Sequence, residues 1–345
     1  MNMQRRYWMA VILLLLGICA CRKDLMEEVF TGFKKPANFP GPAYHFATNP
    51  VTREGFELGR KLFYEPMLSA DNTISCGSCH IQTSAFTHHG HIVSHGVSDR
   101  LGTRNSPPIM NLAWGTSFMW DGGIADLDLQ SIAPITNHVE MDETMANVLN
   151  KLRASSIYPA LFRNAYGSSD ITTERFLKSL SQFMLMCVSS NSKYDSVMRH
   201  DAGKMFSAEE QAGYEIFQSK CASCHKEPLF TDHTFRSNGL SISNVNDEGR
   251  YQVTQIETDR YRFKVPSLRN LAYSAPYMHD GRLLTLEAVL DHYSSQVQNM
   301  PNLDPLLNPG SQPGIPLTGA EKTKLLSFLA TLSDHSFLTD KRFAE

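Results

Sequence analysis

The chain has 345 residues, of which 42% are hydrophobic and 19% are charged, and its formal net charge is −3. This length allows about two ordinary domains, and the composition excludes a disordered chain. The near-neutral charge, without a basic tract, excludes a nucleic-acid-binding protein. Seven cysteines are too few for a disulfide-stabilised scaffold of this size, so other chemistry has to explain their placement.

The start of the chain has the pattern of an export signal. Arg5 and Arg6 precede an apolar run that ends at Ala20, which at about 14 residues is shorter than the ~20 that a membrane-spanning helix needs. The sequence Ile-Cys-Ala-Cys, which ends at Cys21, resembles a bacterial lipobox. We therefore expect cleavage before Cys21, lipidation of its thiol, and contact with a membrane through this lipid anchor alone. The alternative is an ordinary signal peptide with incidental cysteines.

Two C-x-x-C-H motifs dominate the rest of the sequence, Cys76-Gly-Ser-Cys79-His80 and Cys221-Ala-Ser-Cys224-His225. This spacing is typical of haem c attachment. Two thiols on one turn add to the vinyl groups of haem, and the following histidine becomes the proximal ligand of the iron. A zinc site would need two cysteine pairs or further histidines at set spacings. The motifs therefore predict two covalently bound haems c.

An internal repeat accompanies the two motifs. Residues 111–122 (NLAWGTSFMWDG) align without gaps with residues 270–281 (NLAYSAPYMHDG), at an offset of 159. Before each motif a similar pattern, at residues 59–63 and 213–217, predicts a helix that leads into the haem. The repeat predicts a mostly α-helical protein with two cytochrome-c-like domains, each of which binds one haem c covalently.

The boundary between the two halves is expected near residues 191–206. An apolar helical stripe precedes it, at Phe176, Leu180, Phe183, Met184 and Cys187. Because Cys187 lies on this stripe, we expect a buried, inert thiol. Ser207 and Glu210 have the spacing of a capping box and predict the start of the next helix.

The repeat also predicts a difference between the two irons. Residues 285–293 have helical periodicity, which places Val289 and Tyr293 on one inward face. At the 159-residue offset, Gln130 replaces Val289 and Pro134 replaces Tyr293. A tyrosine can ligate haem iron, whereas proline has no donor. We therefore expect one iron with a sixth ligand and one with the open position that a catalytic metal needs.

The ligand of the second iron has alternatives in the same sequence. Met278 and His279 are rivals of Tyr293, but Met119 occupies the repeat position of Met278, which favours a packing role for both methionines. His292 neighbours Tyr293 and points about 100° away on a helix.

Together these motifs resemble the bacterial diheme cytochrome c peroxidase family, including its MauG-like members, over nearly all of the chain after about residue 50. The resemblance is carried by the two haem motifs and by residues 103–107 (TRNSP), 118–122 (FMWDG), 139–141 (VEM), 265–270 (VPSLRN) and 276–281 (PYMHDG). It implies that the N-terminal haem is peroxidatic and that the C-terminal haem receives electrons.

The resemblance also implies roles for individual residues. It implies a distal pocket formed by Gln130, Pro134 and Glu140, with Glu140 as the acid–base group, and it implies Trp120 between the haems. It implies a calcium ion held largely through backbone oxygens, by Asn105, Ser274 and Pro276. As in MauG-like members, Tyr293 stands where other members of the family have a methionine ligand.

His95 follows His88, His89 and His91 in a histidine-rich loop, and two roles are open for it. Some family members close the peroxidatic haem with a loop histidine in the resting oxidised state, and His95 is the nearest candidate. The similarity of residues 94–99 to the MauG-like loop favours a position on the solvent side instead.

The implied function is that of a cytochrome-c peroxidase-type oxidoreductase. It reduces hydrogen peroxide to water in the periplasm with electrons from a small cytochrome c or cupredoxin, and a homodimer is compatible with the resemblance. The alternatives are a MauG-like oxidase that acts on residues of a partner protein, which Tyr293 favours, and a pure electron-transfer diheme cytochrome, which Pro134 disfavours. The expected organisation is a lipoprotein-type signal peptide (1–20), a tether (21–50), an N-terminal peroxidatic haem domain (51–190), a linker (191–206) and a C-terminal electron-transfer haem domain (207–345).

Overall fold

Helices and short helical turns make up most of the secondary structure in the computed structural model, which describes residues 30–308, 310 and 312–345. The signal peptide and Cys21 lie outside these residues. Residues 33–345 form one compact unit, to which the following description applies. None of the helices in the described residues has the length and hydropathy of a membrane-spanning segment.

The α-helices are α2 Arg53–Phe63, α3 Cys76–Cys79, α4 Ile132–Thr136, α5 Met145–Ala154, α6 Tyr158–Tyr166, α7 Thr173–Met186, α8 Lys193–Met198, α9 Ala208–Lys220, α10 Tyr251–Thr254, α11 Leu286–Asp291, α12 Gly319–Ala330 and α13 His335–Leu338. The short 3₁₀ turns are η1 Pro66–Leu68, η2 Gln82–Ser84, η3 Val97–Asp99, η4 Leu112–Trp114, η5 Leu127–Leu129, η6 Glu257–Asp259, η7 Leu271–Tyr273 and η9 Pro305–Leu307, and a π-helical turn, η8 His292–Gln296, continues α11. The strands β1 Phe235–Arg236 and β2 Phe263–Lys264 pair antiparallel, with Phe235 opposite Lys264.

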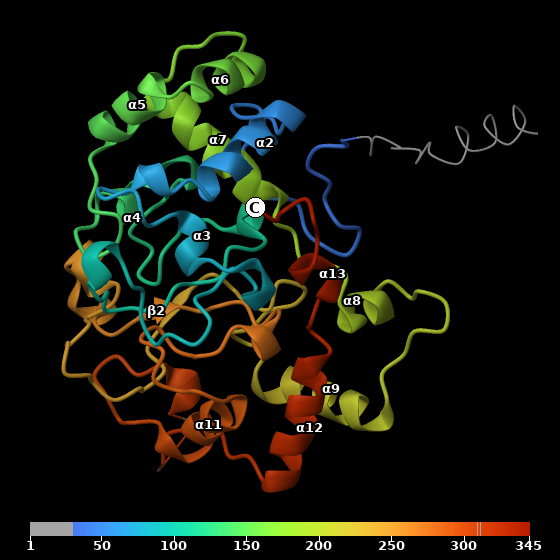
Figure 1. Cartoon of the computed structure of the whole chain (residues 1–345). Coiled ribbons are helices and arrows are strands. Elements are labelled where there is room, and N and C mark those ends of the chain that lie inside the picture. Colours follow the sequence, from blue (N-terminus) through green and yellow to red (C-terminus); the bar gives the residue numbers. More distant parts are fainter. Residues whose placement is uncertain (1–29, 309, 311) are drawn as a thin grey trace, which may run out of the picture. The chain divides into compact units, whose positions relative to one another are not determined.

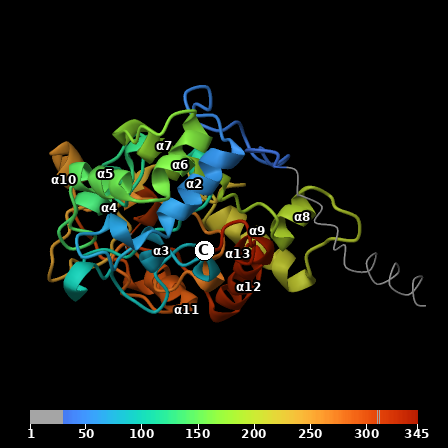
Figure 2. The same cartoon turned by 45° about the horizontal axis from the view of Figure 1, so that its top comes forward.

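Two pairs of crossing helices pack in the same way, with a glycine at the point of contact. Helix α2 crosses α7, and α9 crosses α12, as both views show (Figures 1 and 2). A Cβ atom on Gly59 would lie 1.9 Å from the carbonyl oxygen of Ser179, and one on Gly213 would lie 2.0 Å from that of Lys324. These distances are impossible for real atoms, so only glycine lets the backbones approach so closely. Because Gly59 and Gly213 precede the two haem motifs at matching places, the predicted pair of helices leading into the haems is confirmed.

The two repeat segments share an unusual backbone. Asn111 and Asn270 have φ angles of 56° and 58°, and Met119 and Met278 have φ angles of 69° and 75°. Such left-handed conformations are uncommon outside glycine. Their recurrence at equivalent positions shows that the sequence repeat is also a structural repeat.

The capping box and the buried cysteine that the sequence predicts on either side of residues 191–206 are both present. Ser207 and Glu210 form the capping box at the start of α9. Cys187 at the end of α7 has no exposed surface, and burial raises the pKa of its thiol well above its usual range. The predicted linker at residues 191–206 contains α8, whose Asp195 forms a salt bridge with Arg269 at 2.7 Å, both side chains being inaccessible to solvent.

The segment at residues 33–50 differs from the predicted tether. Phe39 is buried, and its ring packs against that of Trp114 with the centroids 4.9 Å apart. The Trp114 indole N–H donates to the carbonyl of Pro40 at 2.9 Å. The prediction of a tether up to residue 50 is therefore wrong for this segment. The Pro and Gly content suggested a linker, but the interleaved aromatic residues bury enough apolar surface to fix the segment in place.

Candidate functional site

The first C-x-x-C-H motif opens onto a cavity of about 290 Å³. Cys76 and Cys79, at the two ends of α3, line it together with His80. The Nδ1–H of His80 donates to the carbonyl of Phe86 at 2.7 Å, which leaves Nε2 as the nitrogen available for a ligand. Burial lowers the pKa of His80 and favours the neutral imidazole that a metal requires.

Four further predicted residues lie on the wall of this cavity, namely Trp120, Gln130, Pro134 and Glu140. Pro134 is part of α4, and Gln130 follows the 3₁₀ turn η5. The amide Nε2 of Gln130 lies 3.7 Å from the sulfur of Met119. The structure thus brings together every residue that was predicted for the distal pocket.

Glu140 is held by residues that belong to no recognisable sequence motif. Its Oε1 accepts a hydrogen bond from the amide of Asn137 at 3.0 Å, and its backbone carbonyl accepts one from Val97 N at 2.8 Å. Gly96 packs so closely that a Cβ there would lie 2.3 Å from the carbonyl oxygen of Glu140. Burial raises the pKa of Glu140, while the hydrogen bond from Asn137 opposes the rise. No local motif identifies Asn137 or Gly96, because their roles depend on how two loops meet.

His95 lies at the edge of the same cavity and is one third exposed. Its Nδ1 lies 3.0 Å from the Asp99 carboxylate, and its Nε2 lies 3.1 Å from Nδ1 of His91. Both ring nitrogens thus have partners in the loop. The role of His95 as a ligand of the first iron stays a prediction.

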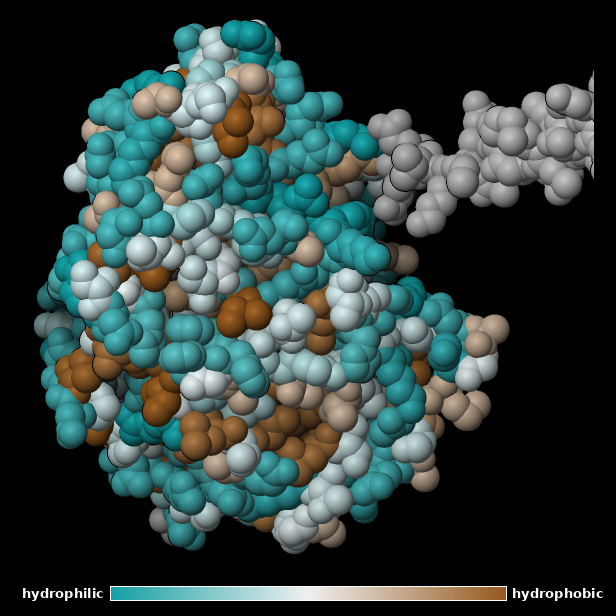
Figure 3. Space-filling model, in the orientation of Figure 1, coloured by the Kyte–Doolittle hydropathy of each residue, from teal (hydrophilic) through white to brown (hydrophobic). Residues whose placement is uncertain are grey.

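The second motif opens onto a larger cavity of about 650 Å³, lined by Cys221, Cys224 and His225. The Nδ1 of His225 lies 3.1 Å from the carbonyl of Phe230 and 3.2 Å from that of Pro266. Its orientation is therefore fixed in the same way as that of His80. Apolar surface gathers around a hollow in the region of α11 and α12, which both contribute residues to this cavity (Figure 3).

Tyr293 lines the second cavity at the π-helical turn η8. Leu286, Val289 and Leu290 line it as well, which confirms that this helical face points inward. Burial raises the pKa of Tyr293 to about 12, whereas its hydrogen bond with Asn238 lowers it. A π-turn in a helix often marks a functional position.

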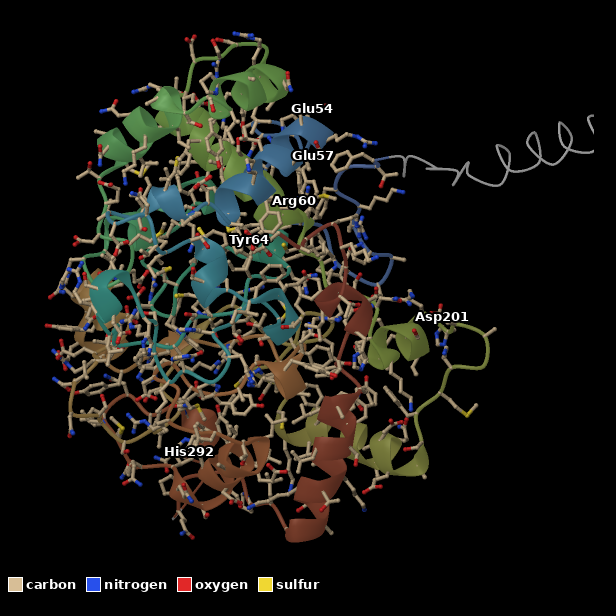
Figure 4. All side chains as sticks on the ribbon, viewed as in Figure 1. Glu54, Glu57, Arg60, Tyr64, Asp201 and His292 are labelled. Carbon is tan, nitrogen blue, oxygen red and sulfur yellow. The ribbon has the colours of Figure 1, made fainter. Side chains whose placement is uncertain are left out.

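The rival ligands have different surroundings. Met278 also lines the cavity, but its sulfur lies 3.4 Å from the amide nitrogen of Asn238. His279 stacks on Phe263 with the centroids 3.7 Å apart. His292, at the end of α11 (Figure 4), is buried with its Nε2 3.1 Å from the carbonyl of Asn238. Asn238 therefore contacts Met278, His292 and Tyr293, and sequence patterns gave no sign of this role.

Trp120 lines both haem cavities. Its indole N–H donates to the carbonyl of Asn105 at 2.8 Å, and Asn105 N donates to the carbonyl of His279 at 2.7 Å. This chain of hydrogen bonds connects Trp120 with His279, its counterpart in the repeat. The indole is thus fixed between the two cavities.

The predicted calcium residues, Asn105, Ser274 and Pro276, lie on the wall of the second cavity. Among the described residues, no group of three or more His, Cys, Asp or Glu side chains is arranged to hold a metal ion. A calcium ion here would therefore depend on backbone and neutral oxygens, as the resemblance implies, and it stays a prediction.

Both cavities fit haem c. Each combines two cysteines without a disulfide, an imidazole fixed through Nδ1, and walls that are mostly apolar. These are the features that covalent attachment and proximal ligation require.

Comparisons with known proteins agree with this chemistry. A family model described as di-haem cytochrome c peroxidase matches residues 53–203. Methylamine utilization protein MauG of Methylorubrum extorquens is 36% identical over 325 residues, which cover 92% of this chain and 88% of that protein. Cytochrome c551 peroxidase of Nitrosomonas europaea is 32% identical over 249 residues, which cover 71% of this chain and 74% of that protein.

A solved structure shows the same architecture. The crystal structure of a MauG-like protein associated with microbial copper homeostasis has a TM-score of 0.79 and 30% sequence identity, and the match covers 90% of this chain and 98% of that chain. The mostly helical fold that the repeat predicted is therefore confirmed. Since two haem motifs face two matching cavities, the cofactors are two covalent haems c. The chain belongs to the di-haem cytochrome c peroxidase family, which includes MauG.

Proposed function

We propose that this protein is a diheme c-type peroxidase that reduces hydrogen peroxide to water at the His80 haem, with electrons from a small cytochrome c or cupredoxin. The observation that carries the proposal is the presence of a partly buried carboxylate, Glu140, and an amide, Gln130, on the wall of the His80 cavity. Pro134 lies on the same wall and offers the iron no donor. An electron carrier has no need of an acid–base group at such a place.

The acid–base chemistry follows from the position of Glu140. Reduction of one peroxide consumes two electrons and two protons and yields two waters. Haem iron, when bound, supplies the electron-transfer chemistry. The Glu140 carboxylate takes the proton from one peroxide oxygen and returns it to the departing oxygen. Its raised pKa helps it hold that proton between the two steps, while the Gln130 amide orients the peroxide by a hydrogen bond.

Electrons are proposed to enter at the His225 haem and to reach the His80 haem by way of Trp120. The contact of this side chain with both cavities supports that role. Tyr293 is proposed as the sixth ligand of the second iron, with Met278 as the alternative. Asn238 supports this assignment. Its amide donates a hydrogen bond to the Met278 sulfur, which engages the rival ligand, and it also hydrogen-bonds with Tyr293.

The test combines carbon monoxide binding with turnover. Carbon monoxide should bind one iron of the fully reduced protein, and reduced cytochrome c or cupredoxin should be oxidised when peroxide is added. Carbon monoxide binding without turnover of any small donor would favour the second candidate, a MauG-like oxidase of a partner protein. Tyr293 at the second iron is the observation that favours this candidate. Absence of carbon monoxide binding would leave only an electron carrier.

The location, calcium site and oligomeric state that we propose do not depend on the peroxidase reaction. Members of this family are exported, and we place this protein in the periplasm, anchored by lipid at Cys21. Cys21→Ser should release a soluble exported form, since several acyl chains hold a lipoprotein firmly. A calcium ion at Asn105, Ser274 and Pro276 should be removed by a chelator, and a homodimer should be visible by sedimentation.

A further inference from the structure

A third cavity of about 110 Å³ adjoins His80. Its lining includes Trp120 and Gln130, which also line the His80 cavity, and His233 and Lys264, which do not. Cys76 and Cys79, which line the 290 Å³ cavity beside the same histidine, do not contribute to this wall. The cavity therefore borders His80 without reaching the two thiols.

Lys264 is a partly buried cation at the end of β2 without a carboxylate partner among the described residues. Its Nζ donates to a neutral group, the backbone carbonyl of Ser117, at 2.7 Å. Burial lowers the pKa of Lys264 to about 8. The nearest acidic influence is Asp121, whose carboxylate already pairs with Arg104. A partly buried ammonium without an anion is unfavourable, so its position here favours a negative ligand.

His233 shows the same lack of a partner. Its Nε2 is buried and has no hydrogen-bond partner, and its backbone adopts a left-handed conformation with φ of 58°. Both features cost free energy. The ring also lies close enough to Lys264 for the two to interact electrostatically. Two donors from neighbouring segments thus line one small cavity, and the described residues offer Lys264 only a neutral acceptor and the Nε2 of His233 none.

The geometry of haem c indicates which anionic group fits beside Lys264 and His233. The vinyl groups that bond to cysteine lie at one edge of the macrocycle, and the two propionate carboxylates lie at the opposite edge. With the vinyl edge at Cys76 and Cys79 and the iron at His80, the propionates have to lie on the side of His80 away from the thiols. The third cavity borders His80 and not the thiols, as this position requires.

We propose that Lys264 and His233 bind a propionate carboxylate of the His80 haem through charge-assisted hydrogen bonds. Such bonds are stronger than those between neutral groups. Lys264 also lines the second haem cavity, and its backbone N–H donates to the carbonyl of Trp120 at 2.8 Å. Its charge therefore lies beside the path between the two irons and favours the reduced state of the His80 haem. The proposal rests on haem at His80 and not on the peroxidase reaction.

The experiment is a potentiometric titration of both haems in the holoprotein, without peroxide. In Lys264→Met, the ratio of reduced to oxidised His80 haem at a fixed potential should fall by about tenfold, as expected for the loss of one nearby charge. The His225 haem should change less, and Lys264→Arg should largely restore the wild-type value. The matched control is Lys204→Met, which removes an exposed charge and should change neither haem.

Resonance Raman spectroscopy gives a second readout that does not depend on potential. The propionate bending band of the His80 haem should shift in Lys264→Met and in His233→Phe. If Lys264→Met does not accumulate with two haems, Lys264→Gln keeps a hydrogen-bonding side chain of similar length and answers the same question. Unchanged potentials and unchanged bands in these variants would overturn the proposal. Loss of turnover in Glu140→Gln with normal potentials would instead bear only on the peroxidase mechanism.

Discussion

Asn111 and Asn270, the first residues of the two repeat segments, both hydrogen-bond to Ser189. The Asn111 amide donates to the Ser189 carbonyl at 3.0 Å and its oxygen accepts from Ser189 N at 2.9 Å. The Asn270 amide donates to the Ser189 hydroxyl at 3.0 Å, and its oxygen accepts from Asp334 N at 2.7 Å. The two copies of the repeat thus meet at one buried serine, which stands just before the predicted linker.

This contact predicts that Asn270→Ala destabilises the folded protein. Each buried group that loses its partner costs about 1–3 kcal/mol, and alanine also tolerates the left-handed backbone less well than asparagine does. The free energy of unfolding of the holoprotein, measured in denaturant by circular dichroism, should fall accordingly. Asn72→Ala is the control, because Asn72 is exposed with φ of 62° and so reports the backbone cost without the buried hydrogen bonds. Equal losses in the two variants would contradict this account.

The two helix crossings predict an inversion of the usual effect of alanine. Replacing a glycine inside a helix by alanine normally stabilises it by about 1 kcal/mol. Gly59→Ala and Gly213→Ala should instead destabilise the protein by about 1–3 kcal/mol or more, because the new methyl group meets the backbone of the partner helix. Gly319→Ala, at the start of α12 with open space around it, should not be destabilising. Thermal unfolding of the three variants gives the comparison.

The buried pair of Asp195 and Arg269 predicts acid sensitivity. Burial alone would raise the pKa of Asp195, but Arg269 and Ser192 outweigh it, so the pKa lies below its usual value. A group whose pKa is lowered on folding stabilises the protein above its unfolded pKa of ~3.9, and this contribution is lost as the pH falls through the folded pKa.

Asp195→Asn should therefore cost about 3–5 kcal/mol near neutral pH, because Arg269 is left without its partner. It should also flatten the decrease of stability at acid pH. The free energy of unfolding against pH, measured in both proteins, shows this effect. Glu174→Gln, which breaks the exposed pair with Lys178, is the control and should leave the profile almost unchanged. Parallel profiles for wild type and Asp195→Asn would refute the prediction.

Glu140→Gln should leave both haem spectra nearly intact and reduce peroxide turnover by about 10²-fold or more, as expected for the loss of an acid–base group. Since the pKa of Glu140 is raised, wild-type turnover should fall as the pH drops below that raised value. The variant should lack this acid limb. Asp142→Asn is a suitable control, because Asp142 lies two residues away and pairs with Arg100 at the surface. Steady-state rates across pH decide the matter, and an unchanged acid limb in Glu140→Gln would assign it to another group.

The asymmetry between the irons predicts one high-spin and one low-spin signal in resting-state electron paramagnetic resonance. Tyr293→Phe should open the iron at His225 and convert the low-spin signal, whereas Met278→Leu should not. Two low-spin signals in the wild type would point to His95 as a ligand at the first iron. A Tyr293→Phe spectrum identical to that of the wild type would move the ligand role to Met278.

Haem attachment is the feature that local sequence determines most completely. The C-x-x-C-H spacing places two thiols and an imidazole on one turn, so a few consecutive residues contain the chemistry. Helical periodicity is also a local pattern, and it predicted the inward face of α11, while the similar residues before the two haem motifs predicted the matched helices α2 and α9. Wherever neighbours in sequence are also neighbours in space, pattern and structure agree.

The tertiary structure alone decided the features that depend on distant segments. Residues 33–50 have the composition of a linker, but Phe39 finds a partner in Trp114 and the segment packs. Trp120 lines both haem cavities because the two repeats fold onto each other. Lys264 and His233 carry no motif, yet they line one cavity beside His80, where no carboxylate of the described residues pairs with Lys264. A single sequence does not reveal which polar groups will be buried together, because that depends on how the helices and loops pack.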